Sequence, residues 1–293
     1  MSLVVPPPVQ QQEGAARRAR RGRRPAGMWA YAVLGAVLLF SAFPVYWSLL
    51  TSSQSQAEIA QTPPDLLPGN HLLDNMQRVF AQANFGQAMV NSLIVASLIT
   101  VSVVFFSVMA GFAFAKLRFR GRHVLMVLVT LTMMIPPQLG VVPLYILMAR
   151  IGWAGHLQAV IVPAMVSAFG VFFMHQYLAG AVPDELVEAA RMDGCSMART
   201  LWHVAFPASR PAAVVLALFT FVQAWNDFFW PLIVLTPASA TVQVALSSLS
   251  SGYYQDFSLV MTGTALATLP VLLLFAVLGK HLFRRFDASY GPG

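Results

Sequence analysis

The sequence predicts an all-α polytopic membrane protein with six transmembrane helices. Hydrophobic residues make up 57% of the 293 residues and charged residues only 10%, against roughly 25% charged in an average soluble domain. Six stretches approach the length of about 20 apolar residues that crosses a hydrocarbon core of about 30 Å. They lie at residues 28–50, 87–115, 124–147, 159–177, 212–235 and 262–283.

The first stretch follows a basic, proline-rich and glutamine-rich segment. Residues 1–27 have too little apolar content to pack, so we expect a disordered basic tail. Arginines before an apolar run also occur in cleaved signal peptides. This run is too long, however, and it ends at Phe43 to Trp47 without a small-residue cleavage site. A retained anchor is the favoured interpretation.

The distribution of basic residues predicts the orientation of the chain. All but two of its 18 Lys and Arg residues fall in the tail, in the loops after spans two and four, and at the C-terminus; the exceptions are Arg78 and Arg150. Cytoplasmic loops of membrane proteins are enriched in Lys and Arg. We therefore expect both termini, including a C-terminal tail at 286–293, to be cytoplasmic. Because the basic residues are scattered, the net charge of +7 does not indicate nucleic-acid binding.

The longest predicted external segment is residues 51–85. Turn signals at Pro63 to Asp65 and at Pro68-Gly69 are followed by Leu72 to Phe80, whose apolar spacing predicts a short surface helix. The loop is either a plain connector or a contact surface for an external partner, and the residues favour neither.

Two predicted spans carry residues that hydrocarbon does not accommodate. Pro136-Pro137 in span three predicts a kink or break about midway. In span five, Asp227 should face water, protein or substrate. The alternative is a position near the outer interface, with Trp225 and Trp230 in an aromatic belt.

Motifs for chemistry are missing from the sequence. The only Gly-Lys pair, Gly279-Lys280, is followed by His281 and lacks the glycine that a phosphate-binding loop needs at position 274. None of the six histidines belongs to a His-Glu-x-x-His arrangement, and the single cysteine, Cys195, has no partner for an internal disulfide. We expect no catalytic residue, no metal site and no cofactor in this chain.

A polar, helix-prone segment at 183–210 lies between spans four and five, on the predicted cytoplasmic side. Pro183 favours a helix start, Gly194 favours its end, and Ser196 favours a second helix running to about Val204. Pro207 and Pro211 are expected to turn the chain into span five. A narrow stripe of mostly small residues is predicted to allow a partner to approach closely: Val187, Ala190, Gly194, Ala198 and Leu201.

This segment resembles the hallmark of the membrane permease subunits of bacterial ATP-binding-cassette importers: Glu-Ala-Ala, three residues to Gly, then a hydrophobic stretch ending in Leu-Pro. The chain has Glu188-Ala189-Ala190, Asp193-Gly194 and Phe206-Pro207, with Phe206 for Leu and Cys195 for Ala. The chain is most similar to the carbohydrate-uptake branch, the maltose-type second permease. Further motifs of that branch occur in family order: Pro63-Pro-Asp65, Asp74-Asn-Met76, Asn91-Ser92, Pro136-Pro-Gln138, Pro143-Leu-Tyr145 and Trp225-Asn-Asp227.

The resemblance implies the type I importer permease fold, with a cytoplasmic coupling helix between spans four and five. It also implies a homologous second permease, two ATPase subunits that bind ATP and Mg, an extracytoplasmic solute-binding protein, and the bacterial cytoplasmic membrane. By that mapping, the residues that couple to the ATPase are Glu188, Ala189, Ala190, Asp193, Gly194, Leu201 and Pro207.

Substrate contacts are candidates by depth and polarity alone, and the resemblance leaves open whether this chain or its sister contacts the solute. The candidates are Asn91, Tyr145, Asn226 and Asp227. Asn91-Ser92 also suits hydrogen bonding between helices. The branch implies a disaccharide, an oligosaccharide or a glycerol phosphodiester. The alternatives are a proton-coupled secondary transporter, for which Asp227 is the only acidic candidate, and a membrane enzyme.

Overall fold

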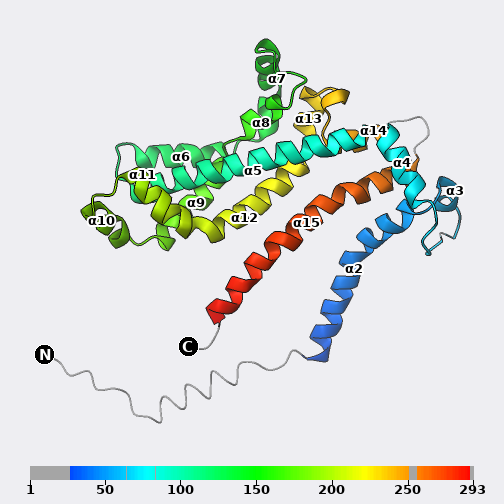
Figure 1. Cartoon of the computed structure of the whole chain (residues 1–293), viewed down its shortest axis with the longest axis horizontal. Coiled ribbons are helices and arrows are strands. Elements are labelled where there is room, and N and C mark those ends of the chain that lie inside the picture. The colour runs from blue at the N-terminus through cyan, green and yellow to red at the C-terminus, as the bar shows by residue number, and fades with distance from the viewer. Residues whose placement is uncertain (1–26, 64, 83, 251–255, 291–293) are drawn as a thin grey trace, which may run out of the picture. The chain divides into compact units, whose positions relative to one another are not determined.

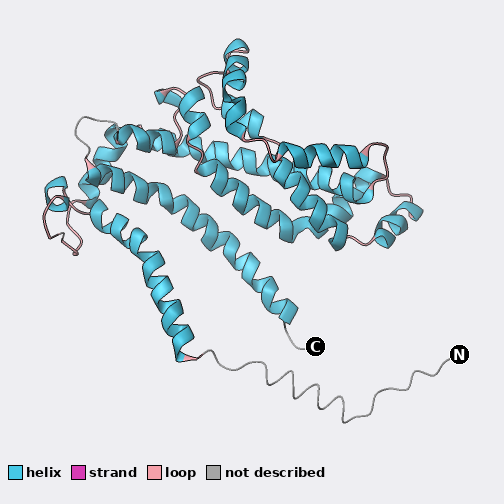
Figure 2. Cartoon of the chain, turned by 180° about the vertical axis from the view of Figure 1, so that it is seen from behind, coloured by secondary structure: helices cyan, strands magenta, loops and turns pink. Residues whose placement is uncertain are grey.

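The computed structural model describes residues 27–63, 65–82, 84–250 and 256–290, with side chains as far as Val277. Every regular element in these ranges is a helix (Figure 2). The chain divides after Leu49 into two compact units. The described part of the first unit belongs to one helix, α2 (Met28–Ser52), which is apolar enough to cross a membrane. The predicted disordered tail lies almost entirely in residues 1–26, outside the described part.

The second unit contains the remaining helices, of which Figure 1 labels the α-helices. They are α3 (Gln56–Ile59), α4 (Leu72–Gln82), α5 (Phe85–Lys116), α6 (Arg122–Thr132), η1 (Pro137–Gly140), α7 (Val141–Arg150), α8 (Gln158–Ala164), α9 (Ala168–Ala181), α10 (Asp184–Met192), α11 (Met197–Thr200), η2 (Leu201–Ala205), α12 (Phe206–Trp225), α13 (Phe229–Val234), η3 (Pro237–Ser239), α14 (Val242–Leu249) and α15 (Phe257–Tyr290). Because α15 extends to Tyr290, the predicted C-terminal tail at 286–293 begins inside a helix.

The predicted pattern of spans agrees with the structure for most of the chain. Within the described residues, five helical segments have the length and composition of a membrane span, or six if a bent pair counts as one. The five are Met28–Ser52, Phe85–Lys116, Gln158–Ala181, Met197–Trp225 and Phe257–Val277.

The bent pair confirms the break that Pro136-Pro137 predicted in span three. The axes of residues 122–132 and 137–150 differ by 91°. Pro137 starts the 3-10 turn η1, where its missing N–H costs no hydrogen bond.

The predicted position of span five was wrong. The predicted span covered residues 212–235, whereas the helical segment runs from Met197 to Trp225. Pro207 and Pro211 do not turn the chain, because both lie in the first two turns of α12, directly after the π-helical turn η2. At the other end, α12 stops before Asn226, and α13 is a separate short helix. The second helix after Ser196 likewise continues past Val204 into the span.

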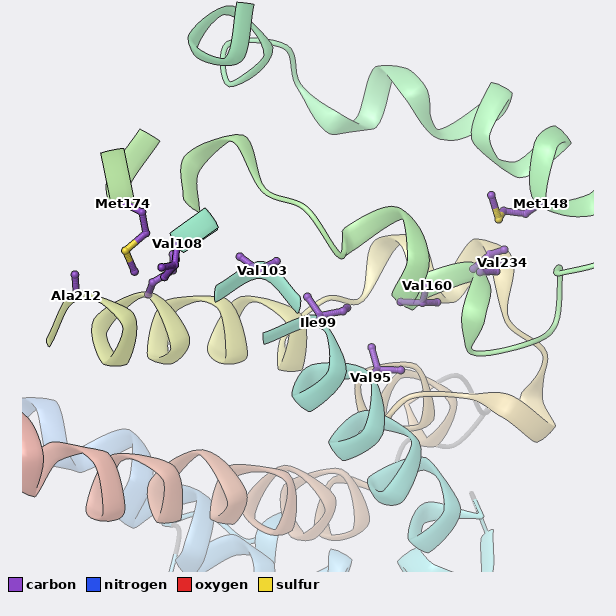
Figure 3. Close-up of a cluster of buried hydrophobic side chains, with 11 residues drawn as sticks. Val95, Ile99, Val103, Val108, Met148, Val160, Met174, Ala212 and Val234 are labelled. Atoms are coloured by element: carbon purple, nitrogen blue, oxygen red, sulfur yellow. The ribbon is translucent and has the colours of Figure 1, made fainter. Parts of the chain in front are cut away.

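Helix α5 provides much of the core of the second unit. Its buried side chains Val95, Ile99, Val103 and Val108 recur at the spacing of one helix face. Figure 3 shows these residues beside apolar side chains of the helices that pack around α5. Those side chains are Met148 of α7, Val160 of α8, Met174 of α9, Ala212 of α12 and Val234 of α13.

Helices α5 and α9 approach each other closely at two glycines. A Cβ on Gly111 of α5 would lie 2.7 Å from the Cβ of Met174 and 2.8 Å from the backbone nitrogen of His175. A Cβ on Gly170 of α9 would clash with the hydroxyl of Ser107. Small residues at such contacts are typical of helix pairs in membranes, where van der Waals packing replaces the hydrophobic driving force.

The segment between α2 and α5 is held by hydrogen bonds around a buried amide. The Asn75 side chain on α4 donates to the carbonyls of Ser52 (3.0 Å) and Gln54 (2.9 Å). Arg78, one turn later, forms an ion pair with Asp256 at 2.6 Å, before α15. Helix α4 confirms the predicted short helix at 72–80. The ion pair fixes this helix to the start of the last span.

We expect Gly111→Leu to destabilise the second unit by about 1–3 kcal/mol, the usual cost of inserting bulk into a packed core. Gly180→Leu is the matched control, because a Cβ on Gly180 of α9 meets nothing within 4 Å. The measurement is the thermal midpoint of both purified variants in the same detergent. Equal midpoints would contradict the close packing of α5 on α9.

Candidate functional site

The segment between α9 and α12 is built by local signals in its own sequence. Val182 and Pro183 form a short extended connector after α9, and Pro183 is the N-cap of α10. Asp184 and Glu185 occupy the first turn of α10, where carboxylates interact favourably with the positive end of the helix dipole. The helix start predicted at Pro183 is confirmed.

A left-handed glycine ends α10. Gly194 has a φ of +77°, and the amide of Cys195 donates to the carbonyl of Ala190 at 2.9 Å. The Ser196 side chain then accepts a hydrogen bond from the amide of Arg199 and caps α11. The predicted helix, turn and second helix start are all present.

One face of this segment packs inward and the other is exposed. Val187 of α10 is buried with Phe112 of α5 and Ala205 of η2, and Leu201 packs against the same cluster. Two residues of the predicted stripe, Val187 and Leu201, thus contact this chain's own bundle, whereas Gly194 and Ala198 of the same stripe are exposed. Leu201, proposed as a coupling residue, belongs to this inward side.

The exposed face contains most of the other predicted coupling residues. Glu188, Ala189, Asp193 and Gly194 are exposed, Pro207 is exposed in the first turn of α12, and Ala190 is half-buried. Leu186 and Met192 also have exposed apolar side chains, and Met192 is 88% exposed. These two residues were not among the predicted ones, although their positions beside the Glu-Ala-Ala motif could have identified them.

Lys116, the last residue of α5, connects this segment to the bundle. Its side chain is only 6% exposed, and its ammonium donates to the carbonyl of Ala179 (3.2 Å) and to the carboxylate of Asp184 (2.7 Å). The hydrogen bond and the charge of Lys116 hold the pKa of Asp184 below its ordinary value, and the charges of Arg118 and Arg122 act in the same direction.

The four predicted substrate-path residues do not form one cluster of direct contacts. Asn91 is buried and donates to the carbonyl of Ala240 at 3.0 Å. Asn226 is exposed after α12 and accepts a hydrogen bond from Gln243 at 3.4 Å. Asp227 is half-buried between α12 and α13, and Tyr145 on α7 is 41% exposed.

Sequence reasoning missed two amides that join this polar set. Gln87 donates to Asn91 at 2.9 Å, and Gln243 donates to Asn226. Gln87 lies four residues before Asn91, so helical spacing could have revealed it. Asn91 and Ser92 bind the backbone at Ala240 and Val242, in agreement with the interhelical hydrogen-bonding alternative.

The two tryptophans near Asp227 pack inside the helix bundle. Trp225 is buried, and its indole N–H donates to the carbonyl of Ala267 in α15. Trp230 donates to the carbonyl of Ala159 in α8. Both indole N–H groups thus bind backbone within this chain, and the position of Asp227 near the outer interface stays a prediction. Among the residues that the structure describes, no group of three or more His, Cys, Asp or Glu side chains is arranged to hold a metal ion.

The chain belongs to the family of binding-protein-dependent transport system inner membrane components, whose model matches residues 104–288. It is 31% identical over 267 residues to an arabinooligosaccharides transport system permease protein of Halalkalibacterium halodurans, covering 89% of this chain and 95% of the relative. It is 32% identical over 260 residues to a lactose transport system permease protein of Rhizobium radiobacter, covering 88% and 94%.

More distant likenesses agree with this family. A sn-glycerol-3-phosphate transport system permease protein of Yersinia enterocolitica is 28% identical over 271 residues, covering 89% of this chain and 96% of the relative. A chain in the crystal structure of a bacterial ABC transporter involved in alginate import has the same fold. Its TM-score is 0.75 at 24% identity, and the match covers 87% of this chain and 95% of that chain.

We expect Gly194→Val to disrupt the turn after α10, because a β-branched residue at this positive φ costs of the order of 1–2 kcal/mol. Gly194→Asn is the control, since asparagine tolerates the left-handed region. Amide hydrogen exchange should rise across residues 190–200 in the valine variant alone. Equal exchange in both variants would contradict the requirement for a left-handed residue at position 194 in the turn after α10.

We also expect Asp184 to titrate below about 3.9, the ordinary aspartate pKa. A depressed folded-state pKa means that the ion pair contributes fully above the unfolded pKa and is lost as the pH falls through the folded pKa. Carbon-13 chemical shifts of the carboxyl group measure it. Lys116→Met should raise the pKa; an unchanged value in that variant would contradict the assignment.

Proposed function

We propose that this chain is the permease subunit of an ATP-driven, binding-protein-dependent importer, and that it forms with a sister permease the path for a sugar or sugar-like solute. The main support is one observation: a chain of this family exposes a helix–turn–helix segment, α10 to α11, between two membrane spans. The segment is too short to fold as a domain of its own, so its exposed apolar side chains suit a protein partner.

The names of the relatives support the solute class. They are permeases for arabinooligosaccharides, lactose and sn-glycerol-3-phosphate, which all carry at least two hydroxyl groups. Tyr145, Asn226 and Asp227 remain the residues of this chain proposed to line the path. Asn91 is a weaker candidate, because its amide already donates to Ala240.

The proposed assembly contains two ATPase subunits below the membrane and a solute-binding protein outside it. The excess of Lys and Arg in residues 1–27 and in the loops after spans two and four supports a cytoplasmic location for both termini. The same excess supports a location of α10 and α11 on the ATPase side. ATP and Mg would bind to the ATPase subunits, since this chain lacks a phosphate-binding loop.

We propose that the exposed face of α10 seats in the ATPase through Glu188, Ala189, Asp193 and Gly194. Coupling requires this contact to differ between the open and closed states of the ATPase, because a contact that is equal in both transmits nothing. The inward face, with Val187 against Phe112 and Ala205, would then pass the movement to α5 and α12. Family membership favours this ATP-driven mechanism over a proton-coupled transporter.

We expect Ala189→Trp to abolish ATP-driven uptake without affecting membrane insertion. Ala189 is exposed on α10, so the indole adds bulk toward the partner rather than into the bundle. Ala189→Ser is the control. The assay uses proteoliposomes that contain the permease pair and both ATPase subunits. The solute-binding protein whose gene neighbours those of the permeases is added to the vesicles. Lactose, an arabinooligosaccharide and sn-glycerol-3-phosphate are the labelled solutes.

The two parts of the proposal fail in different ways. Uptake at the wild-type rate by Ala189→Trp would contradict docking through α10. ATP-independent uptake by the purified chain alone would contradict the importer assignment. Failure of all three labelled compounds to enter, in vesicles where the binding protein stimulates ATP hydrolysis, would contradict the proposed solute class.

A further inference from the structure

The joint between α9 and α10 consists of extended backbone. Val182 has φ and ψ of −114° and 105°, and Pro183 has −59° and 145°. A two-residue extended connector has no helical hydrogen bonds across it, so it does not by itself fix the angle between the helices. The orientation of α10 therefore depends on contacts made by side chains.

Lys116 spans this joint. Its ammonium binds the carbonyl of Ala179, in the last turn of α9, and the carboxylate of Asp184, in the first turn of α10. The two acceptors are on opposite sides of the connector. Both acceptors are suited to a cation: the Ala179 carbonyl lies at the end of a helix, where carbonyls lack intrahelical donors, and the Asp184 carboxylate carries a negative charge.

The exposure of the two charges is unequal. The Lys116 side chain is 6% exposed, whereas the Asp184 side chain is 77% exposed. A buried ammonium strongly requires partners, and a charge-assisted bond is stronger than a neutral one. The bond therefore holds α10 to α5, although the Asp184 carboxylate itself borders solvent.

Two further contacts join the same face of α5 to the segment. Phe105, Phe112 and Lys116 are spaced by seven and four residues, which places them on one face of the helix. Phe112 is buried with Val187 and Ala205, and the Phe105 ring lies 5.9 Å from the Phe206 ring. α5 in turn packs against α8, α9, α12 and α14.

We propose that Lys116 is a positioning residue for energy coupling, and that its bond across the α9–α10 joint sets the angle at which α10 meets its partner. This inference rests on the proposed function. Without the bond, α10 would still dock, but its movement would be taken up at the extended connector instead of reaching α5. The defect would be in the solute imported per ATP hydrolysed rather than in assembly.

The test measures the ratio of solute imported to ATP hydrolysed, in the proteoliposomes described above. Lys116→Met keeps the aliphatic stem and removes the charge, and Lys116→Arg keeps the charge. We expect the ratio to fall at least tenfold in the methionine variant, with ATP hydrolysis within about twofold of wild type, and to recover in the arginine variant. A wild-type ratio in Lys116→Met would overturn the proposal.

A second pair of variants keeps the test decisive if Lys116→Met does not fold. Asp184→Asn removes the exposed partner, and Glu185→Gln removes the same charge from the next residue without touching the bond. Only Asp184→Asn should lower the ratio, and it should add little to Lys116→Met, since both remove one interaction. Equal ratios for the Asp184 and Glu185 variants would overturn the proposal.

A distance measurement distinguishes a positioning role of the Lys116–Asp184 bond from a general contribution to stability. Spin labels at Met192 and Arg120, in a chain with Cys195 replaced by serine, report the distance from α10 to the loop after α5. We expect a broader distance distribution in Asp184→Asn than in Glu185→Gln, at equal thermal midpoints. Identical distributions would overturn the inference. The proposed function would fail separately, if the purified chain alone imported solute without ATP.

Discussion

Close packing of α5 against α9 is the contact on which the second unit depends. In a membrane, helices gain little from the hydrophobic effect, so their backbones must approach closely enough for van der Waals contact. Gly111 and Gly170 permit this approach. α12 packs beside both of these helices. The core residues of α7, α8 and α13 belong to the same buried cluster as Val95 and Ile99 of α5.

The same constraint explains where non-helical backbone is found. The break before Pro137 and the turn after Trp225 both interrupt apolar sequence, and unsatisfied backbone groups are costly in hydrocarbon. Near the second turn, side chains supply some of the missing partners. Asn226 donates to the carbonyl of Val222, Asn91 donates to the carbonyl of Ala240, and Ser92 accepts from the amide of Val242. The polar residues of this region are thus partly explained by backbone satisfaction.

Much of the fold could be predicted from sequence, because apolar length and proline pairs act locally. The six stretches, the break at Pro136-Pro137, the left-handed Gly194 and the cap at Ser196 needed no tertiary information. Span five was misplaced, because prolines that often end a helix are also tolerated in its first turns. The direction of the Val187 and Leu201 stripe was missed since periodicity identifies a face but not its neighbour. Lys116 was missed because its partners lie more than 60 residues away in sequence.

The π-helical turn at Leu201–Ala205 joins α11 to α12 without a loop. A π turn holds one residue more than the α-helical turn that would replace it. A chain that lacked one residue here would form an ordinary α-helical turn in its place, and the helix faces before and after the turn would keep nearly the same register, because the wider turn absorbs the extra residue. A single-residue deletion in the regular first turns of α12 would instead rotate the α10 surface about the helix axis by roughly 100°, the angle per residue of an α-helix, so the π turn is the place in this helix where a change of length leaves the α10 surface facing the same way.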